Sequence, residues 1–383
     1  MSTITQLKIG VLGGGQLGRM MIQSAMDFNL DISVLDPDPN APCRSLVESF
    51  EVGELTDYDT IMAFGADKDL LTIEIENVNT NALKDLQKQG KKVFPQPEVI
   101  ALIQDKRTQK QFYRDNGIPT ASFVLTETKE EVANYQHMLP AVHKLGKEGY
   151  DGRGVQMIRS SEDLDKAFDK PGLLETLIDF EKELSVIVAR NENGETETFP
   201  VVELAFHPEA NLVEYLFAPA QVNEEIEKKA RALAIEVMQK LQLVGLLAVE
   251  MFLSEDGEVL VNEIAPRTHN SGHQTIEANV TSQFEQHLRA ILNLPLGDTS
   301  QLAPASMVNV LGAEGYTGDA IYQGMEMVMS EPGAHIHLYG KKTTKPFRKM
   351  GHITITDSDI ESLKARTMKI KDLISVIACT SQK

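Results

Sequence analysis

Short apolar runs alternate with helical periodicity over the first part of the chain. The run at 7–12 ends in three glycines at 13–15, and apolar residues then recur at helical spacing as far as Phe28. Further apolar runs, at 32–35 and 70–75, lead into acidic residues. Strand–helix alternation of this kind predicts an open, mostly parallel sheet whose ligands lie at the carboxyl ends of the strands.

The pattern changes near residue 105. A basic helix is predicted at 106–116, a capping box at Thr128 opens another helix, and 224–241 has the spacing of a long amphipathic helix. Short strands are predicted at 140–145, 155–158 and 184–188. Beyond about residue 295, a glycine-rich stretch leads to a segment with β character. We therefore expect domain boundaries near residues 105 and 295.

Two apolar runs, at 246–253 and 258–265, predict a β-hairpin. They are separated by four residues that include Asp256-Gly257, the sequence preferred by a two-residue type I′ turn. If these two residues form the centre of the turn, Glu255 pairs with Glu258.

The same register puts Glu250 directly opposite Glu263. Like charges opposed on a sheet cost about 0.2–1 kcal/mol, and the cost rises in surroundings as apolar as these strands. A divalent cation would offset it, because Mg²⁺ takes one or two protein carboxylates and completes its shell with phosphate and water. The alternative is a solvated hairpin whose glutamates face water.

Two glycine-rich loops are candidates for binding anions. Gly13-x-Gly15-x-x-Gly18, with Asp36 further on, has the shape of a dinucleotide fingerprint, although a tight turn without a ligand has the same form. Lys144 precedes a loop with three glycines at 149–154, where backbone N–H groups and a mobile ammonium suit phosphate. No Gly-Lys-Ser/Thr follows, so this is not a Walker A loop, and a surface hairpin is the alternative.

Polar segments follow the hairpin and recur near the C-terminus. Residues 266–273 are polar or small and follow the second hairpin strand directly, which suits ligand contact. A zinc site of the His-Glu-x-x-His type is not expected there, because Gly272 breaks any helix. A second segment, at 341–349, holds five cations and predicts either an anion site or a solvated face.

Composition excludes several classes of protein. The chain has 383 residues and a formal net charge of −19, which disfavours nonspecific binding to nucleic acid or anionic membrane. Its two cysteines, Cys43 and Cys379, form no disulfide framework and suggest a reducing compartment. No apolar run is long enough to span a membrane, and the N-terminus does not resemble a signal peptide. We expect a soluble, cytoplasmic, multidomain protein.

Four motifs in combination carry a family resemblance. The segments 13–20, 149–154, 262–273 and 348–352 resemble, in order, those of the N5-carboxyaminoimidazole ribonucleotide synthetases, which are ATP-grasp ligases of purine biosynthesis. The resemblance implies a mixed α/β and α+β fold of three parts. These are a Rossmann-like pre-ATP-grasp domain at 1–104, an ATP-grasp domain at 105–295 with a lid at about 118–182, and a small C-terminal domain with β character at 296–383.

The resemblance also implies a reaction. ATP phosphorylates bicarbonate to carboxyphosphate, which carboxylates the exocyclic amine of 5-aminoimidazole ribonucleotide to give the N5-carboxy compound, ADP and phosphate. ATP and Mg²⁺ are therefore the expected substrate and metal ion, and a homodimer is expected because similar enzymes are dimers.

Site residues follow from the same resemblance. It assigns Mg²⁺ to Glu250 and Glu263. The expected ATP-binding residues are Lys106, Lys144, Gly149, Tyr150, Asp151, Gly152, Arg153, Gly154, Val155, Glu175, Thr176, Leu177, Ile178, Glu183, His207, Asn262 and Glu263. The expected ribonucleotide-binding residues are Gln16, Leu17, Glu76, His269, Asn270, His273, Lys341 and Arg348. The expected catalytic residues are Asp151, Arg153, Arg267 and His273.

Within these sets the resemblance implies particular roles. Lys106, at a position that is often Arg in the family, and Lys144 would neutralise the ATP phosphates, and the glycine loop would close over them. Residues 175–178 would line the adenine slot, and Glu183 would accept the ribose hydroxyls. Arg267 and His273 would lie near bicarbonate, and Asp151 would orient or deprotonate the amine.

The chain departs from similar enzymes at two places, and other functions remain open. Ala265 stands where many ATP-grasp enzymes carry Asn, a feature shared with the carboxyaminoimidazole branch, and Lys147-Glu148 replaces small residues before the loop. Three alternatives are a NAD-dependent dehydrogenase, a formate-using glycinamide ribonucleotide transformylase and a catalytically silent nucleotide-binding regulator. The dehydrogenase reading explains neither Glu250 and Glu263 nor the Lys144 loop.

Overall fold

The N-terminal part forms an open parallel sheet, as predicted, and its five strands lie in the order β3-β2-β1-β4-β5. The computed structural model describes residues 4–147, 154–207 and 212–379. The strands are β1 (Lys8–Leu12), β2 (Asp31–Asp36), β3 (Ser49–Val52), β4 (Leu70–Ile73) and β5 (Lys92–Val93). The helices are α1 (Gln16–Asp27), α2 (Tyr58–Gly65), α3 (Thr80–Lys88) and α4 (Pro97–Ile103). Because β1 lies between β2 and β4, the loops after β1 and β4 are neighbours at the carboxyl edge.

A small antiparallel sheet follows helix α5 (Lys106–Asp115), in the order β6-β9-β7-β8. Its strands are β6 (Phe123–Thr126), β7 (Ala141–Leu145), β8 (Val155–Ile158) and β9 (Gly172–Thr176). The helix opened at Thr128 is only the four-residue α6 (Lys129–Val132). The predicted capping box is wrong, because the Thr128 side chain does not cap the helix and the Glu131 carboxylate accepts the N–H of Glu127 instead.

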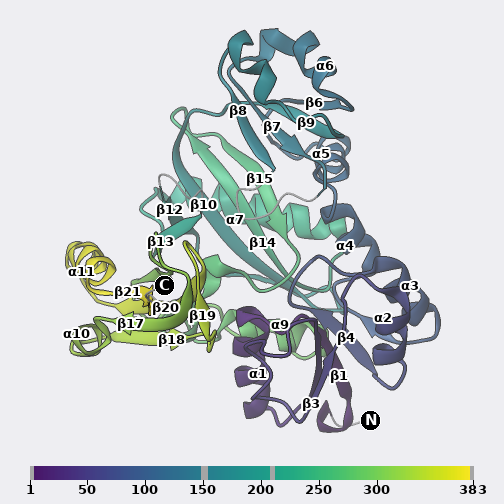
Figure 1. Cartoon of the computed structure of the whole chain (residues 1–383), viewed down its shortest axis with the longest axis vertical. Coiled ribbons are helices and arrows are strands. Elements are labelled where there is room, and N and C mark those ends of the chain that lie inside the picture. Colours follow the sequence, from purple (N-terminus) through teal and green to yellow (C-terminus); the bar gives the residue numbers. More distant parts are fainter. Residues whose placement is uncertain (1–3, 148–153, 208–211, 380–383) are drawn as a thin grey trace.

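A nine-stranded sheet forms the centre of the molecule, between the small sheet and the first sheet (Figure 1). Its strand order is β15-β14-β10-β12-β13-β16-β20-β18, and β11 pairs with β10. The first six strands along the chain are β10 (Phe180–Arg190), β11 (Thr196–Thr198), β12 (Val202–Phe206), β13 (Val213–Ala218), β14 (Gly245–Ser254) and β15 (Val259–Ala265). The last three are β16 (Ala305–Leu311), β18 (Ala334–Leu338) and β20 (Lys349–Thr356).

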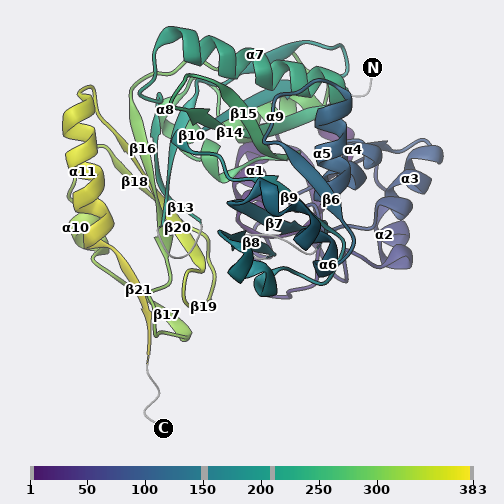
Figure 2. The same ribbon diagram turned by 90° about the horizontal axis from the view of Figure 1, so that it is seen from above.

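The C-terminal segment has the β character predicted for it, and it extends the central sheet. β16 pairs with β13, so the sheet continues from the middle of the chain into β20 and β18 (Figure 2). The remaining C-terminal elements are β17 (Gly318–Gln323), α10 (Met325–Met329), β19 (Thr343–Thr344), α11 (Ile360–Leu373) and β21 (Ser375–Ala378).

Two helices bury the faces of the central sheet. α7 (Glu224–Leu241) presents the predicted apolar face to β10 and β14, and a buried Leu or Val of this kind contributes about 1.5–3 kcal/mol. α9 (Gln283–Ile291) buries Phe284 and Leu288 against α1 of the first sheet, which fixes the glycine turn relative to the central sheet. Among the described residues, no helix is long and apolar enough to cross a membrane.

Candidate active site

Glu250 on β14 lies directly opposite Glu263 on β15, as the hairpin register predicts. The predicted turn is nevertheless wrong. Ser254 pairs with Glu258, because the Ser254 N–H donates to the Glu258 carbonyl over 3.0 Å. The Gly257 N–H donates to the Ser254 carbonyl over 3.0 Å. Of the turn residues, only Gly257 has a positive φ, +80°. A type I′ turn needs two such residues, so the loop has three residues instead of two.

A bulge restores the register that the turn alone would lose. The three-residue loop pairs Met251 with Val261, and on that register Glu250 would face Asn262. The pairing shifts between Met251 and Glu250, which leaves Asn262 as the extra residue of β15. The carboxylate pair therefore depends on a local irregularity of the strand.

The two carboxylates differ in environment. Burial, together with the negative charges of Glu263 and Glu183, raises the pKa of Glu250 to about 8. Burial alone would also raise the pKa of Glu263, but the Lys106 and Lys144 ammonium groups lower this pKa overall. The Glu263 side chain is 49% exposed and that of Glu250 is 19% exposed. Without a cation, one carboxyl group of the pair is thus protonated near neutral pH and the other is paired with lysine.

Two lysines reach this pair from different elements. Lys106, the first residue of α5, forms an ion pair with Glu263, and its N–H donates to the Gly146 carbonyl over 2.8 Å. Lys144 on β7 places its Nζ 3.2 Å from Asn262 Oδ1, on the bulge. The predicted phosphate-binding lysines therefore lie beside the predicted metal carboxylates.

Glu175 on β9 holds Lys144 from the other side. It forms ion pairs with Lys144 and with Lys110, whose Nζ lies 2.9 Å from Glu175 Oε2. Burial would raise the pKa of Glu175, but the two lysines lower it to about 2. Lys110 was not predicted, although its spacing of four residues from Lys106 puts both on one face of α5.

The predicted adenine segment connects the small and central sheets. Residues 177–179 join β9 to β10, and the Leu177 N–H donates to the Pro140 carbonyl over 3.1 Å. Glu183 lies further along β10, on the face of Ser185, which pairs with Glu250. Burial raises the pKa of Glu183 to about 7, against the lowering effect of Lys144. The ribose acceptor proposed from the sequence thus shares a sheet face with the carboxylate pair.

Other residues of the predicted ATP site are partly described. Val155 pairs with Lys144, and the Gly154 carbonyl accepts the Leu145 N–H over 2.8 Å. Residues 149–153 lie outside the described residues. His207, at the end of β12, packs edge-on against Phe347, with 5.3 Å between the ring centroids. That contact puts it beside the C-terminal cationic segment.

At the glycine turn, side chains occupy the positions of a bound phosphate. The Gly14 N–H donates to Asp36 over 2.6 Å, and the Leu17 N–H, at the start of α1, donates to Glu74 over 3.1 Å. A Cβ at Gly15 would collide with the Glu74 carboxylate. In a dinucleotide fold the pyrophosphate sits at this helix N-terminus and the acidic residue holds ribose. This geometry disfavours the dehydrogenase reading.

Glu74 was not predicted as a site residue, and burial raises its pKa to about 7. It directly follows β4 and lies beside the turn, where Gln16 begins α1. Arg267 pairs with Glu76 and Lys342 donates to Asn40 over 3.0 Å, so the segment after β15 and the C-terminal cationic segment both reach this edge of the first sheet. A Glu at the end of a parallel strand next to a glycine turn is the signal that identifies it.

Further contacts join the predicted ribonucleotide residues. Arg267 Nε lies 2.9 Å from Glu76 Oε1, and Lys341 Nζ donates to the Lys349 carbonyl over 2.7 Å. Three more of these residues contact neighbouring groups. Arg348 donates to the Thr343 carbonyl over 2.8 Å, and the Asn270 amide donates to Asn309 Oδ1 over 3.0 Å. His269 Nε2 lies 3.6 Å from Glu250 Oε1. His273 lies beneath them, buried beside Gln283 and Phe284.

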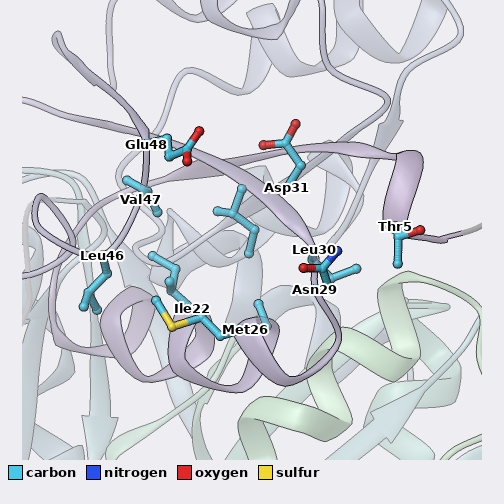
Figure 3. A pocket seen from close by; sticks show the side chains of 11 residues that line it. Thr5, Ile22, Met26, Asn29, Leu30, Asp31, Leu46, Val47 and Glu48 are labelled. Atoms are coloured by element: carbon cyan, nitrogen blue, oxygen red, sulfur yellow. The ribbon is translucent and has the colours of Figure 1, made fainter.

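A separate hollow on the first sheet lies apart from this site (Figure 3). It has a volume of about 350 Å³ and an apolar lining that includes Ile22, Met26 and Leu46, with the carboxylates of Asp31 and Glu48 beside them. None of its lining residues is basic, so it offers no partner for the phosphates of a nucleotide. The carboxylate–lysine cluster remains the candidate active site.

Comparison with known proteins identifies the family of the chain. Family models match residues 6–104 (ribonucleotide synthetase preATP-grasp domain), 111–284 (ATP-grasp domain) and 305–366 (phosphoribosylaminoimidazole carboxylase C-terminal domain). The N5-carboxyaminoimidazole ribonucleotide synthase of Bacillus subtilis is 40% identical over 357 residues, which cover 90% of each chain. Several fungal and plant relatives named phosphoribosylaminoimidazole carboxylase are longer, and the chain spans about two thirds of their length.

Two solved structures are similar over nearly the whole chain. N5-carboxyaminoimidazole ribonucleotide synthetase from Thermotoga maritima has 42% identity and a TM-score of 0.90, covering 97% of this chain and 99% of that one. The Aspergillus clavatus enzyme, in complex with ADP and 5-aminoimidazole ribonucleotide, has 34% identity and a TM-score of 0.87, covering 96% and 98%. The predicted succession of domain types is confirmed. The chain belongs to the N5-carboxyaminoimidazole ribonucleotide synthase family of ATP-grasp ligases.

Proposed function

We propose that this chain carries out its family's reaction, the ATP-dependent carboxylation of 5-aminoimidazole ribonucleotide in purine biosynthesis, with bicarbonate as the carboxyl source. The products are N5-carboxyaminoimidazole ribonucleotide, ADP and phosphate. The observation that carries the proposal is the opposed pair Glu250 and Glu263, with Lys106 and Lys144 beside it. Carboxylates and lysines in this arrangement suit a magnesium-bound triphosphate.

The carboxylate pair fits Mg²⁺ by its donor chemistry. Glu250 and Glu263 offer hard oxygen ligands, and no group of three or more His, Cys, Asp or Glu side chains suited to a metal ion occurs among the described residues. Mg²⁺ typically takes one or two protein carboxylates and fills its other positions with phosphate and water. When bound, it would neutralise charge that develops on the triphosphate.

Protein groups orient the nucleotide. Lys106 and Lys144 neutralise the phosphates, and Glu175 with Lys110 keeps Lys144 in place through two ion pairs. The adenine lies along residues 175–178, and Glu183 accepts the ribose hydroxyls. Asn262, on the bulge, and His207 complete the expected nucleotide contacts.

The ribonucleotide lies at the edge where three segments converge. Gln16, Leu17 and Glu76 come from the first sheet, and His269 and Asn270 from the segment after β15. Lys341 and Arg348 pair with its phosphate, because two cations at one edge of an acidic protein form a favourable site for a dianion. This role accounts for the cationic segment, which the sequence alone leaves undecided.

The chemistry has two steps. A bicarbonate oxygen attacks the γ-phosphorus, ADP leaves, and carboxyphosphate forms. The exocyclic amine then attacks the carboxyl carbon, phosphate leaves, and the nitrogen loses a proton. Arg267 and His273 lie near bicarbonate, and Asp151 and Arg153 act at the amine. Closure of the glycine loop, Gly149 to Val155, excludes water from the short-lived carboxyphosphate.

ADP release in a coupled assay tests the proposal. With magnesium and ATP present, release should require both bicarbonate and 5-aminoimidazole ribonucleotide. Release that instead requires formate and another amine would favour a transformylase, and ATP binding without acceptor-dependent release would favour a regulator. We further propose a homodimer in the cytoplasm that binds neither nucleic acid nor membrane, in keeping with the free thiols of Cys43 and Cys379 and the net charge of −19.

A further inference from the structure

Three histidine rings from distant parts of the chain stack in one column. The rings of His337 on β18 and His352 on β20 are almost parallel, at 10°, with centroids 4.5 Å apart. The centroid of the His352 ring lies 4.6 Å from that of His273, which follows β15, and these two rings are inclined at 32°. The ring of Phe284 on α9 also contacts His273, with 6.0 Å between the centroids. His273 and His352 are 1% and 0% exposed, so the column belongs to the interior.

Polar groups fix the edges of this column. Glu277 on α8 (Thr275–Ala278) lies 2.6 Å from His337 Nε2, and the Tyr339 hydroxyl lies 3.0 Å from His352 Nδ1. A buried imidazole costs more free energy than an apolar ring, because each ring nitrogen needs a partner. Burial also keeps the pKa of His352 and of His273 well below the usual value, so both rings are neutral. If these rings served only to fill the core, phenylalanine at the same positions would be more favourable than histidine.

The column joins the segments that converge on the ribonucleotide. His273 ends the segment that holds Arg267 and His269, while the chain continues from the end of β18 through Tyr339 to Lys341. β20, which contains His352, begins directly after Arg348. The Lys341 ammonium also lies 5.6 Å from the centre of the Tyr339 ring. Each ring of the column is therefore only a few residues from a group assigned to this substrate.

We propose that Glu277, His337 and His352 are positioning residues, which hold the segment of His273 at a fixed distance from the segments of Lys341 and Arg348. Ring contact between His337, His352 and His273 sets the distance between the backbones, and the Glu277–His337 pair fixes the position of the His337 ring. This inference rests on the proposed function, since it concerns how the ribonucleotide site is kept in shape. The contacts of Glu277, His337 and His352 described above involve neither Lys106 nor Lys144 of the proposed ATP site.

Two conservative variants separate the polar anchor from simple packing. His337→Phe keeps a stacked ring but loses the partner of Glu277, and Glu277→Gln keeps the volume but loses the charge. His335→Phe is the matched control, because His335 lies on the same strand and is exposed to solvent. For each protein, KM for the ribonucleotide, KM for ATP, kcat and Tm are measured.

We expect both variants to raise the ribonucleotide KM about tenfold, with the ATP KM within about twofold of the parent, because loss of the Glu277–His337 hydrogen bond releases the His337 ring from its fixed position. The control should match the parent. Equal changes in both KM values, unchanged values, or unfolding of both variants would overturn the positioning role. Failure of the proposed function would be seen separately, as absence of ribonucleotide-dependent ADP release in the parent protein.

Discussion

Lys106 forms an ion pair with Glu263, one of the two carboxylates assigned to the metal ion. The lysine is also assigned to the ATP phosphates, so it has two alternative partners. In the protein without nucleotide, the Lys106 ammonium group contacts the carboxylate that a metal ion would bind. Binding of magnesium and ATP together gives each charge a new partner, since phosphate accepts the lysine and the metal ion takes the carboxylate.

Replacing Lys106 should therefore have opposite effects on two ligands. In Lys106→Met, Mn²⁺ as a probe should bind roughly tenfold more tightly without nucleotide, because a nearby positive charge is gone. The KM for ATP should rise. Electron paramagnetic resonance of free Mn²⁺ measures the first effect and ADP release the second. Lys129→Met is a suitable control, since Lys129 pairs with Asp165 in the small-sheet region. Weaker Mn²⁺ binding to the Lys106 variant would contradict this account.

Glu263→Gln should reduce turnover by about a hundredfold or more while the fold stays intact, because it removes a metal ligand from a formed hairpin. ADP release and circular dichroism are measured together. Glu258→Gln provides a matched control, since Glu258 lies on the same hairpin and is exposed. Near-normal turnover in Glu263→Gln would refute the assignment of this carboxylate to the metal ion.

Lys341→Ala and Arg348→Ala should each raise the ribonucleotide KM about tenfold, with little effect on the ATP KM, because each removes a charge-assisted contact to phosphate. Steady-state kinetics with each substrate varied in turn gives both constants. Lys364→Ala, on α11, serves as the control, because Lys364 pairs only with Glu361 among the ion pairs described for it. Similar increases for both substrates would assign these cations elsewhere.

Glu175 gives a prediction about pH. The folded pKa of Glu175, about 2, lies below the usual 4.5, so its stabilising effect is fully present above pH 4.5 and is lost as the pH falls from 4.5 towards 2. Glu175→Gln should lower the free energy of unfolding at pH 7 by about 3 kcal/mol, because it leaves buried lysines unpaired. The Tm of Glu175→Gln should be lower than that of the parent protein at pH 7, and this gap in Tm should narrow below pH 4.5. The exposed neighbour Glu181, changed to Gln, should show no gap, and a constant gap for Glu175→Gln would contradict the ion-pair account.

The hairpin illustrates how far sequence reasoning reaches. Two apolar runs separated by a turn sequence predicted the two strands, and the predicted pairing of Glu250 with Glu263 was right, although the predicted turn was wrong. Asp256-Gly257 favours a two-residue turn, but the loop has three residues, and the bulge at Asn262 compensates. A bulge depends on contacts across the sheet, and periodicity along a single strand does not reveal it.

The features that the sequence did not predict depend mostly on pairing between segments far apart in the chain. The parallel first sheet followed from local alternation, whereas the continuation of the central sheet into β16 and β20 depends on pairing between distant segments. The column of His273, His337 and His352 could not be predicted for the same reason, because these residues are far apart in the chain and their spacing follows no helix or strand period. Glu74 and Lys110 did have local signals, a strand end beside a glycine turn and a helical spacing of four.

The central claim is that ATP is used to attach a carboxyl group from bicarbonate to the ribonucleotide. Carbon-labelled bicarbonate, incubated with magnesium, ATP and 5-aminoimidazole ribonucleotide, tests it most directly when labelled product and ADP are counted in the same reaction. The account predicts one labelled carboxyl group in the product for each ADP released. ADP release that depends on the ribonucleotide but leaves no label in the product would contradict it.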